Sequence, residues 1–186
     1  MKNLGIVALV ILLSASFTSC EKVKGLFDVD VETTMSGDLD IDIPESALKA
    51  AGPYEFDTLV VVDPMDYGDV AENEERIESI TADGIIAKVE AVNIGEKNIE
   101  DLVLTDVSFT IKNSSISATW TRTEEWPIQV GSTLTLEDIN DVYSGVNEIL
   151  TSIDPFTITC KGKSSLKGIS ITIVVDINCT VTGNLL

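Results

Sequence analysis

Strict alternation of apolar and polar residues is the feature that most constrains the fold of this chain. Between residues 169 and 181 every second position is apolar. Successive side chains of a β-strand point to opposite faces of its sheet, so this pattern is typical of a strand with one buried face. A helix would instead need apolar residues three and four positions apart. The inward residues of this predicted strand are Ile169, Ile171, Ile173, Val175, Ile177, Cys179 and Val181.

A second alternating segment covers residues 27–43, where apolar residues occupy odd positions on both sides of Gly37. Its even positions carry the acids Asp28, Asp30, Glu32, Asp38, Asp40 and Asp42. The segment is either a hairpin that turns at residues 35–37 or one long bent strand. In a hairpin, opposed acids would repel, and calcium, which takes about six to eight oxygen ligands, would relieve the repulsion. We prefer a solvated strand face for these acids. The alternative is a calcium site formed by Asp30, Glu32, Asp40 and Asp42.

Two other segments have helical features. Residues 69–80 carry acids near their start, where the helix dipole favours them. Residues 136–151 repeat apolar residues at steps of three and four, behind a capping box from Thr135 to Asp138. Further short strands are predicted at residues 59–62, 85–91, 103–111, 116–123, 126–130 and 156–160. Seven to nine strands without a βαβ rhythm predict an all-β fold, an antiparallel β-sandwich with two inserted helices, as a single domain over residues 26–186.

The first nineteen residues have the properties of an export signal. Lys2 precedes an apolar run at residues 4–13. As a helix this run would reach about 15 Å, half the thickness of a bilayer's hydrocarbon core. We therefore expect a signal peptide at residues 1–19. The run leads into Phe17-Thr18-Ser19-Cys20, which resembles the lipobox of bacterial lipoproteins.

The lipobox resemblance implies cleavage before Cys20, acylation of Cys20, and a tether over residues 20–25. An ordinary secretory signal that happens to contain a cysteine is the alternative. Several acyl chains on one residue are sufficient for stable membrane anchoring. The implied partner is thus a membrane, reached through the lipid on Cys20.

The order of elements resembles a group of small Bacteroidota-type envelope lipoproteins for which a β-sandwich is expected. More loosely it resembles immunoglobulin-like and late-embryogenesis-abundant-like sandwiches. The resemblance rests on the lipobox, a long alternating strand, an acidic helix leading into residues 75–80, a second helix and a final alternating strand. It implies a location in the cell envelope, at the outer membrane, on either its periplasmic or its surface face. Asp57-Thr58-Leu59 resembles the O-glycosylation motif of exported Bacteroidota proteins, which implies a modified Thr58 near a loop edge.

Composition excludes several classes of function. The chain has 31 acids, 12 bases and a net charge of −19, so nucleic acid is not an expected partner. It contains no histidine, which removes Ser-His-Asp and Cys-His nucleophiles and histidine metal sites. We expect no enzymatic activity, no metal and no cofactor. A carboxylate pair for glycoside hydrolysis is the residual alternative.

The sequence therefore predicts a non-enzymatic binding or structural accessory module. One alternative is a carrier of an apolar ligand between envelope layers, which needs an internal apolar cavity. Another is a carbohydrate-binding accessory protein, which needs exposed aromatic residues. The candidates for that platform are Trp120, Trp126, Tyr54, Tyr67 and Tyr143. Trp120 lies on the apolar side of its predicted strand, so core packing is preferred.

Cys160 and Cys179 also lie on the apolar sides of their predicted strands. A turn at Ser164-Ser165 would join these strands as a hairpin and place Cys179 about 33 Å beyond the residue opposite Cys160. A disulfide needs Cα atoms within about 7 Å. We therefore expect two free, buried thiols that pack as small apolar side chains.

Overall fold

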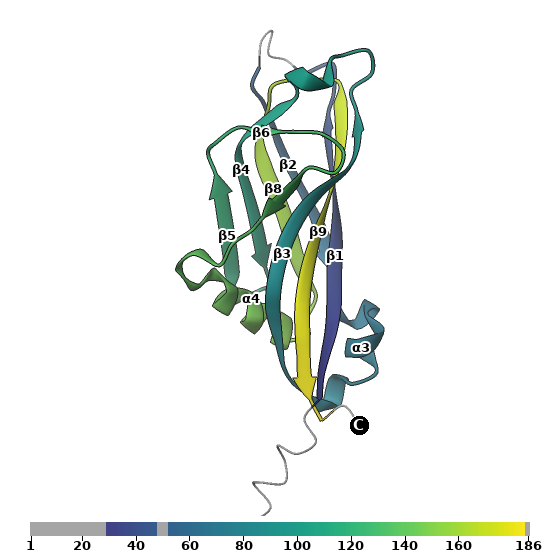
Figure 1. The fold of residues 1–186 in the computed structure, drawn as a ribbon, viewed down its shortest axis with the longest axis vertical. Helices are drawn as coiled ribbons and strands as arrows, with labels where there is room; N and C mark the ends of the chain where they lie inside the picture. Colours follow the sequence, from purple (N-terminus) through teal and green to yellow (C-terminus); the bar gives the residue numbers. More distant parts are fainter. Residues whose placement is uncertain (1–28, 48–51, 185–186) are drawn as a thin grey trace, which may run out of the picture.

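Two antiparallel sheets pack face to face in the computed structural model, which describes residues 29–47 and 52–184 (Figure 1). The long sheet has the order β1 (Val29–Ile43), β9 (Ile169–Gly183), β3 (Ile77–Asn93) and β7 (Thr133–Thr135). The short sheet has the order β2 (Tyr54–Val62), β8 (Phe156–Ser164), β4 (Val103–Lys112) and β5 (Ser117–Arg122), with β6 (Trp126–Pro127) also paired to β4. The α-helices are α3 (Gly68–Ala71) and α4 (Val142–Thr151), and single 3-10 turns span Pro64–Asp66, Glu74–Arg76, Ile99–Asp101 and Ile139–Asp141. The predicted β-sandwich with two inserted helices is confirmed.

The N-terminal alternating segment is one strand, so the hairpin interpretation is wrong. β1 pairs with β9 along its whole length, from Val29 opposite Gly183 to Ile43 opposite Ile169. A turn at residues 35–37 would have broken this ladder of backbone hydrogen bonds. Gly37 instead lies in the middle of β1, on the side that faces the short sheet.

The expected hairpin of the last two strands is also wrong. β8 lies between β2 and β4 in the short sheet, whereas β9 lies between β1 and β3 in the long sheet. The segment between Ser164 and Ile169 therefore crosses from one sheet to the other. β9 has long neighbours on both edges, which leaves no free edge for β8.

Both helices are shorter than predicted. The acidic segment forms only α3 and the turn Glu74–Arg76, after which Ile77 begins β3. From Ile77 onward the backbone is an extended strand, because it pairs with β9 and Ile77 lies opposite Gly183. The local acidic pattern did not reveal that distant strand partner.

The predicted capping box of the second helix does not form. Thr135 belongs to β7, opposite Ile86. Asn140 and Asp141 have positive φ angles of 58° and 62°, which interrupt the helix before Val142. Asp138 instead accepts a hydrogen bond from the backbone N–H of Tyr143 at 2.9 Å.

The core fills the space between the sheets with the inward residues of the alternating strands. At two places a β-bulge changes which residues of a strand face the core, compared with the predicted alternation. A register shift between Thr105 and Ser108 buries Leu104. A second shift between Val89 and Ala91 turns Ala91 outward. The largest fully buried side chains include Phe109, Phe156, Met35, Leu39, Ile41, Ile80, Ile85, Leu102 and Leu104.

One polar stripe of α4 covers the edge of β3 where β7 does not reach. The backbone N–H of Ile85 donates to the Tyr143 hydroxyl at 3.1 Å, and that of Ala82 donates to Asn147 Oδ1 at 2.8 Å. One turn further along, Thr151 Oγ1 accepts from the N–H of Ile80 at 3.0 Å. Side chains four residues apart lie on one helix face, so α4 takes the place of a neighbouring strand. Figure 1 shows α4 beside the lower part of β3.

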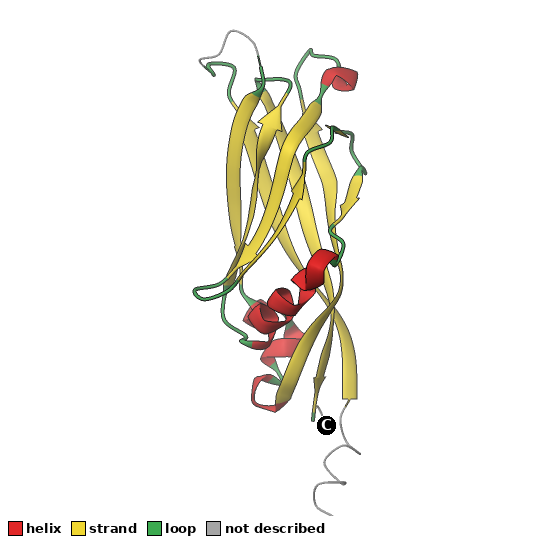
Figure 2. Cartoon of the chain, turned by 90° about the vertical axis from the view of Figure 1, so that its left-hand side faces the viewer, coloured by secondary structure: helices red, strands yellow, loops and turns green. Residues whose placement is uncertain are grey.

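Side-chain hydroxyls cover the opposite edge of the long sheet. The Tyr67 hydroxyl accepts from Ser36 N at 2.7 Å and donates to Ser36 O at 3.0 Å. Thr58 Oγ1 donates to Asp40 O at 2.8 Å. In Figure 2, α3 and α4 lie in the same half of the molecule as the C-terminus. Among the described residues, no helix has the length and apolar character needed to cross a bilayer.

Gly37→Ala is expected to lower the free energy of unfolding by about 1–3 kcal/mol, because the core at this point has no room for a methyl group. An added Cβ would lie 2.8 Å from Val60 Cγ1 and 3.0 Å from Ile158 Cδ1. Gly84→Ala on β3 is the matched control, since its nearest neighbour would be Asn178 Nδ2 at 4.0 Å. Urea denaturation of both variants measures the difference, and equal stability of the two would contradict the close packing at Gly37.

Candidate binding groove

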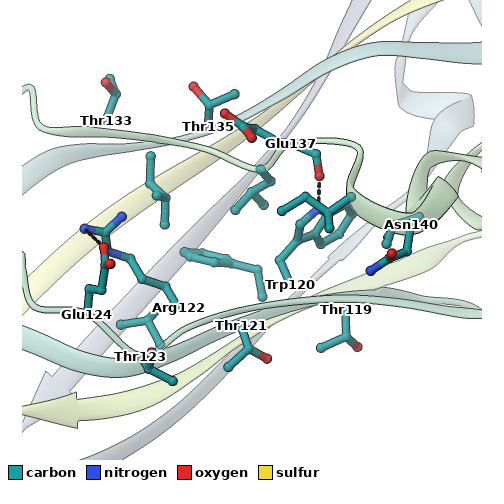
Figure 3. Close-up of a pocket in the computed structure, with 16 residues that line it drawn as sticks. Thr119, Trp120, Thr121, Arg122, Thr123, Glu124, Thr133, Thr135, Glu137 and Asn140 are labelled. Atoms are coloured by element: carbon teal, nitrogen blue, oxygen red, sulfur yellow. Dashed lines mark hydrogen bonds and ion pairs between the residues drawn. The ribbon is translucent and has the colours of Figure 1, made fainter.

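The two sides of the sandwich close differently. On the side of β1 and β2, the contact of Gly37 with Val60 and the hydrogen bond from Thr58 to Asp40 bring the sheets together. On the other side, β5 and β7 border a groove of about 660 Å³ (Figure 3). We call this groove, which lies between β5 and the segment from Thr133 to Val142, the open seam.

The floor of the open seam is already packed. Val107 and Phe109 are 1% exposed, and Leu136 is 3% exposed. Leu134 is half-buried, and Ile139 at one end is 57% exposed. The groove therefore offers an apolar ligand little surface, and its accessible apolar atoms belong chiefly to the rim.

Trp120 lines the end of the open seam nearest α4, and Tyr143 packs against it. Trp120 Nε1 donates to Glu137 O at 2.8 Å (Figure 3). Its ring meets that of Tyr143 edge-on, at 6.4 Å between centroids. The Tyr143 hydroxyl donates to Leu136 O at 2.8 Å, and burial raises the pKa of this phenol. Both aromatic residues are thus fixed by structural contacts.

Arg122 lies at the other end of the open seam, on the inward side of β5. Figure 3 shows Trp120 and Arg122 pointing between the two bordering segments. One guanidinium nitrogen, Nη2, lies 3.5 Å from Glu124 Oε2 and 3.3 Å from Glu125 O. Arg122 Nε is buried and has no hydrogen-bond partner in the described part of the chain. A buried donor of this kind is costly to leave unpaired.

Within residues 29–47 and 52–184, no strand pairs with the outer backbone edge of β5, which faces the open seam. Asn113 N donates to Ile116 O, and hydrogen-bonded and non-hydrogen-bonded pairs alternate along an antiparallel ladder. Thr119 and Thr121 therefore fall at non-hydrogen-bonded positions opposite β4. Their N–H and C=O groups point away from β4, towards the outer edge.

On the other side of the groove, the shorter outer edge of β7 has no partner strand among the described residues. Leu136 N donates to Ile85 O, which places Thr133 and Thr135 at non-hydrogen-bonded positions opposite β3. Their backbone groups point away from β3. The open seam thus lies between two strand edges.

The four acids of the alternative calcium site do not come together. Asp40 and Asp42 pair with Thr172 and Ser170 near one end of β1, whereas Asp30 and Glu32 pair with Thr182 and Thr180 near the other. Asp30 and Asp40 each accept a hydrogen bond of 2.8 Å from the opposite threonine hydroxyl. Residues 29–47 and 52–184 contain no group of three or more potential metal ligands. Cys20 lies outside the described residues.

Thr58 lies in the middle of β2, so the expected position at a loop edge is wrong. The strand begins at Tyr54 because Tyr54 and Phe56 continue the inward alternation opposite β8. Thr58 is half-buried, and its hydroxyl is engaged with β1. Its glycosylation remains a prediction from the motif.

Core packing of the tryptophans is confirmed. Trp120 is 7% and Trp126 is 5% exposed, and Trp126 contacts Phe109 edge-on at 6.4 Å between ring centroids. Tyr54 is buried, and Tyr67 covers the edge of β1. These side chains do not form the flat exposed platform that a carbohydrate site needs.

Cys160 and Cys179 are free and buried, as expected, although for a different reason. They lie in different sheets, on β8 and β9, so it is the separation of the two sheets and not a hairpin register that keeps them apart. Burial raises the pKa of Cys179 to about 11 and raises that of Cys160 further above its ordinary value. The thiolate is the reactive form of cysteine, so both side chains have low reactivity near neutral pH.

Sequence reasoning missed the residues that define the open seam. Arg122 was recognisable in the sequence, because it follows Ala118 and Trp120 at every second position and so faces the core side of β5. A charged residue on an apolar face often marks the end of a core or a site. The free edges of β5 and β7 left no comparable signal, since they follow from the order of strands in the sheets.

Both thiols are expected to react with a thiol reagent at pH 8 only after denaturation. Their raised pKa values leave little thiolate, and the sulfur atoms are shielded. The measurement uses the Cys20→Ala chain, in which only Cys160 and Cys179 remain. Intact mass should show no label on the native chain and two labels in denaturant. Two labels on the native chain, or none in denaturant, would contradict this assignment.

Comparisons with known proteins do not identify a family. No protein-family model and no curated protein matches this chain. Among solved structures, the decameric BFDV capsid protein is similar at a TM-score of 0.44 and 10% sequence identity, over 83% of this chain and 99% of that chain. A likeness at this level carries no argument about function.

Proposed function

We propose that this chain is a lipid-anchored, non-enzymatic accessory protein of the bacterial cell envelope, and that its β-sandwich is a binding module. The observation that carries the proposal is the sequence Phe17-Thr18-Ser19-Cys20 after a ten-residue apolar run at residues 4–13. This sequence resembles a lipobox, so Cys20 would carry the lipid and hold the domain at the outer membrane. The order of elements, similar to that of Bacteroidota-type envelope lipoproteins, supports the same location.

The course of the strands is consistent with an anchor at one end of the sandwich. β1 begins at Val29, nine residues after Cys20, and pairs there with Gly183 of β9. The 15 residues of β1 extend over about 50 Å. The opposite end of the sandwich would therefore stand well away from the lipid.

Contacts between three separate connections hold that distant end together. Lys97 Nζ lies 3.0 Å from Glu45 Oε2 and 3.4 Å from Gly168 O. Ser165 Oγ donates to Asp101 O at 2.6 Å. These contacts make the distant end of the long sheet rigid.

The chemistry of the described residues favours binding over catalysis. The carboxylates of Asp30, Asp40 and Asp83 accept hydrogen bonds from threonine hydroxyls on β9. Cys160 and Cys179 are buried. These three carboxylates and both thiols therefore have structural roles.

The two alternative functions receive less support. A carrier needs interior volume, whereas Val107 and Phe109 in the floor of the open seam are almost completely buried. A carbohydrate-binding protein needs exposed aromatic rings, whereas Trp120 and Trp126 belong to the core.

Cys20→Ala should release the protein from the membrane fraction, because it removes the acylated thiol. Cys179→Ala is the matched control and should stay in the membrane, since Cys179 is a buried core residue. Fractionation after a high-salt wash, followed by immunoblotting, measures both. Retention of the Cys20→Ala variant in the washed membrane would contradict the lipid anchor.

A further inference from the structure

We propose that the open seam binds an extended basic peptide segment of another protein, which adds to the short sheet as a strand beside β5. This inference deepens the proposed function by naming the class of partner that the binding module takes. It depends on the sandwich alone, and the lipid on Cys20 takes no part in it.

The first support comes from the backbone. Thr119 and Thr121 direct their N–H and C=O groups out of the sheet, over a strand of six residues. An exposed edge of this kind is a template for a further strand, whose main chain supplies the complementary donors and acceptors. Parts of two other edges are covered in the described chain, by α4 along β3 and by Tyr67 and Thr58 at Ser36 and Asp40 of β1.

The second support is the composition of the β5 edge. Proteins usually protect an exposed edge with charged residues, proline or a bulge. Residues 117–121 read Ser-Ala-Thr-Trp-Thr, without charge or proline. The ladder from Val107–Arg122 to Lys112–Ser117 runs without a register shift. The edge of β5 is therefore regular, and its only charged residue is Arg122 at the end of the strand.

The third support is the unpaired donor of Arg122. Its buried Nε has no acceptor in the described part of the chain, although Nη2 has two. A strand beside β5 would bring backbone carbonyl groups to this end of the open seam. With a rotation of the partly exposed Arg122 side chain, one of them would accept from Nε and remove the cost of the unpaired donor.

The rim supplies apolar contacts for a guest strand. Alternate side chains of that strand would point inward, towards Leu134 on β7 and Ile139 beyond it. Ile139 is among the most exposed large apolar residues of the described chain. A short aliphatic side chain suits this shallow space, because Phe109 and Leu136 already fill the floor.

Charge selects a basic guest. Glu124 and Glu137 line the open seam against the single cation Arg122. Glu125 and Asp138 follow them directly in sequence, and the whole chain has a net charge of −19. Lysine or arginine residues in the guest would find carboxylates at both ends of the groove, which gives specificity and faster association.

The test uses the full-length chain in non-ionic detergent and a capped seven-residue synthetic peptide of alternating lysine and valine. The same peptide with glutamate in place of lysine is the charge control. Titration followed by amide chemical shifts should move the Thr119 and Thr121 resonances, and affinity should fall as salt is added. The glutamate peptide should bind at least tenfold more weakly.

Thr121→Pro is the decisive variant, because it removes an N–H that points away from β4 and leaves the ladder of β4 and β5 intact. It should weaken peptide binding about tenfold or more, through one lost hydrogen bond and the bulk of the ring. Thr121→Ala keeps the N–H and should bind within about twofold of the unsubstituted chain. A thermal melt of both variants confirms that each is folded.

Several outcomes would overturn the inference. These are no binding of the lysine peptide at millimolar concentration, equal binding by Thr121→Pro and Thr121→Ala, or peptide-induced shifts confined to residues away from β5. If sedimentation shows that the unsubstituted chain is a dimer and the Thr121→Pro variant a monomer, a second copy of the chain occupies the edge. If Thr121→Pro fails to fold, slower hydrogen exchange of the Thr119 and Thr121 amides on addition of peptide to the unsubstituted chain decides the question. Because none of these readouts involves Cys20, a failure here leaves the membrane anchor standing, and release of the anchor leaves this result standing.

Discussion

Backbone groups at the edges of strands are the constraint on which this structure depends. Three strands of the long sheet have 15 to 17 residues, whereas the strands of the short sheet have at most 10. Within the long sheet, β1 is an outer strand and β7 pairs with only three residues of β3, so much of both edges has no neighbouring strand. Buried or half-buried N–H and C=O groups need partners, so other side chains must supply them.

The protein solves this problem differently on its two sides. Tyr143, Asn147 and Thr151 of α4 accept hydrogen bonds from β3, so the helix has a role beyond filling the core. Tyr67 and Thr58 serve the edge of β1. β5 lacks such a cover in the described structure, and this contrast is the basis on which we propose its edge as a site for a partner.

The alternating pattern predicted most of the strands because its cause is local. Inward residues of β9 and the second half of β1 are buried as the parity requires. The positions where the helices begin and end depend on strands that are distant in sequence, so the local pattern predicted these limits wrongly. Ile77 extends because β9 lies beside it, and Thr135 extends because it pairs with Ile86 of β3. Local sequence does not contain either contact.

The candidate site was less accessible to sequence reasoning than the fold. The lipobox at Cys20 is a local motif, and the expectation of an anchor rests on it entirely. The open seam arises from the order of strands, which places β5 and β7 at the edges of different sheets. Arg122 on an inward position was the one visible trace of it. Binding at an uncovered strand edge uses backbone groups that nearly every residue has, so the amino-acid composition hardly reveals it.

Hydrogen exchange of individual amides in the protein without any partner tests this account most directly. The amides of Ala82 and Ile85 should exchange slowly, because side chains of α4 accept their hydrogen bonds. The amides of Thr119 and Thr121 should exchange much faster, although they belong to a regular strand beside β4. Protection of Thr119 and Thr121 equal to that of Ala82 and Ile85 would contradict the account, because the edge of β5 would then already be covered.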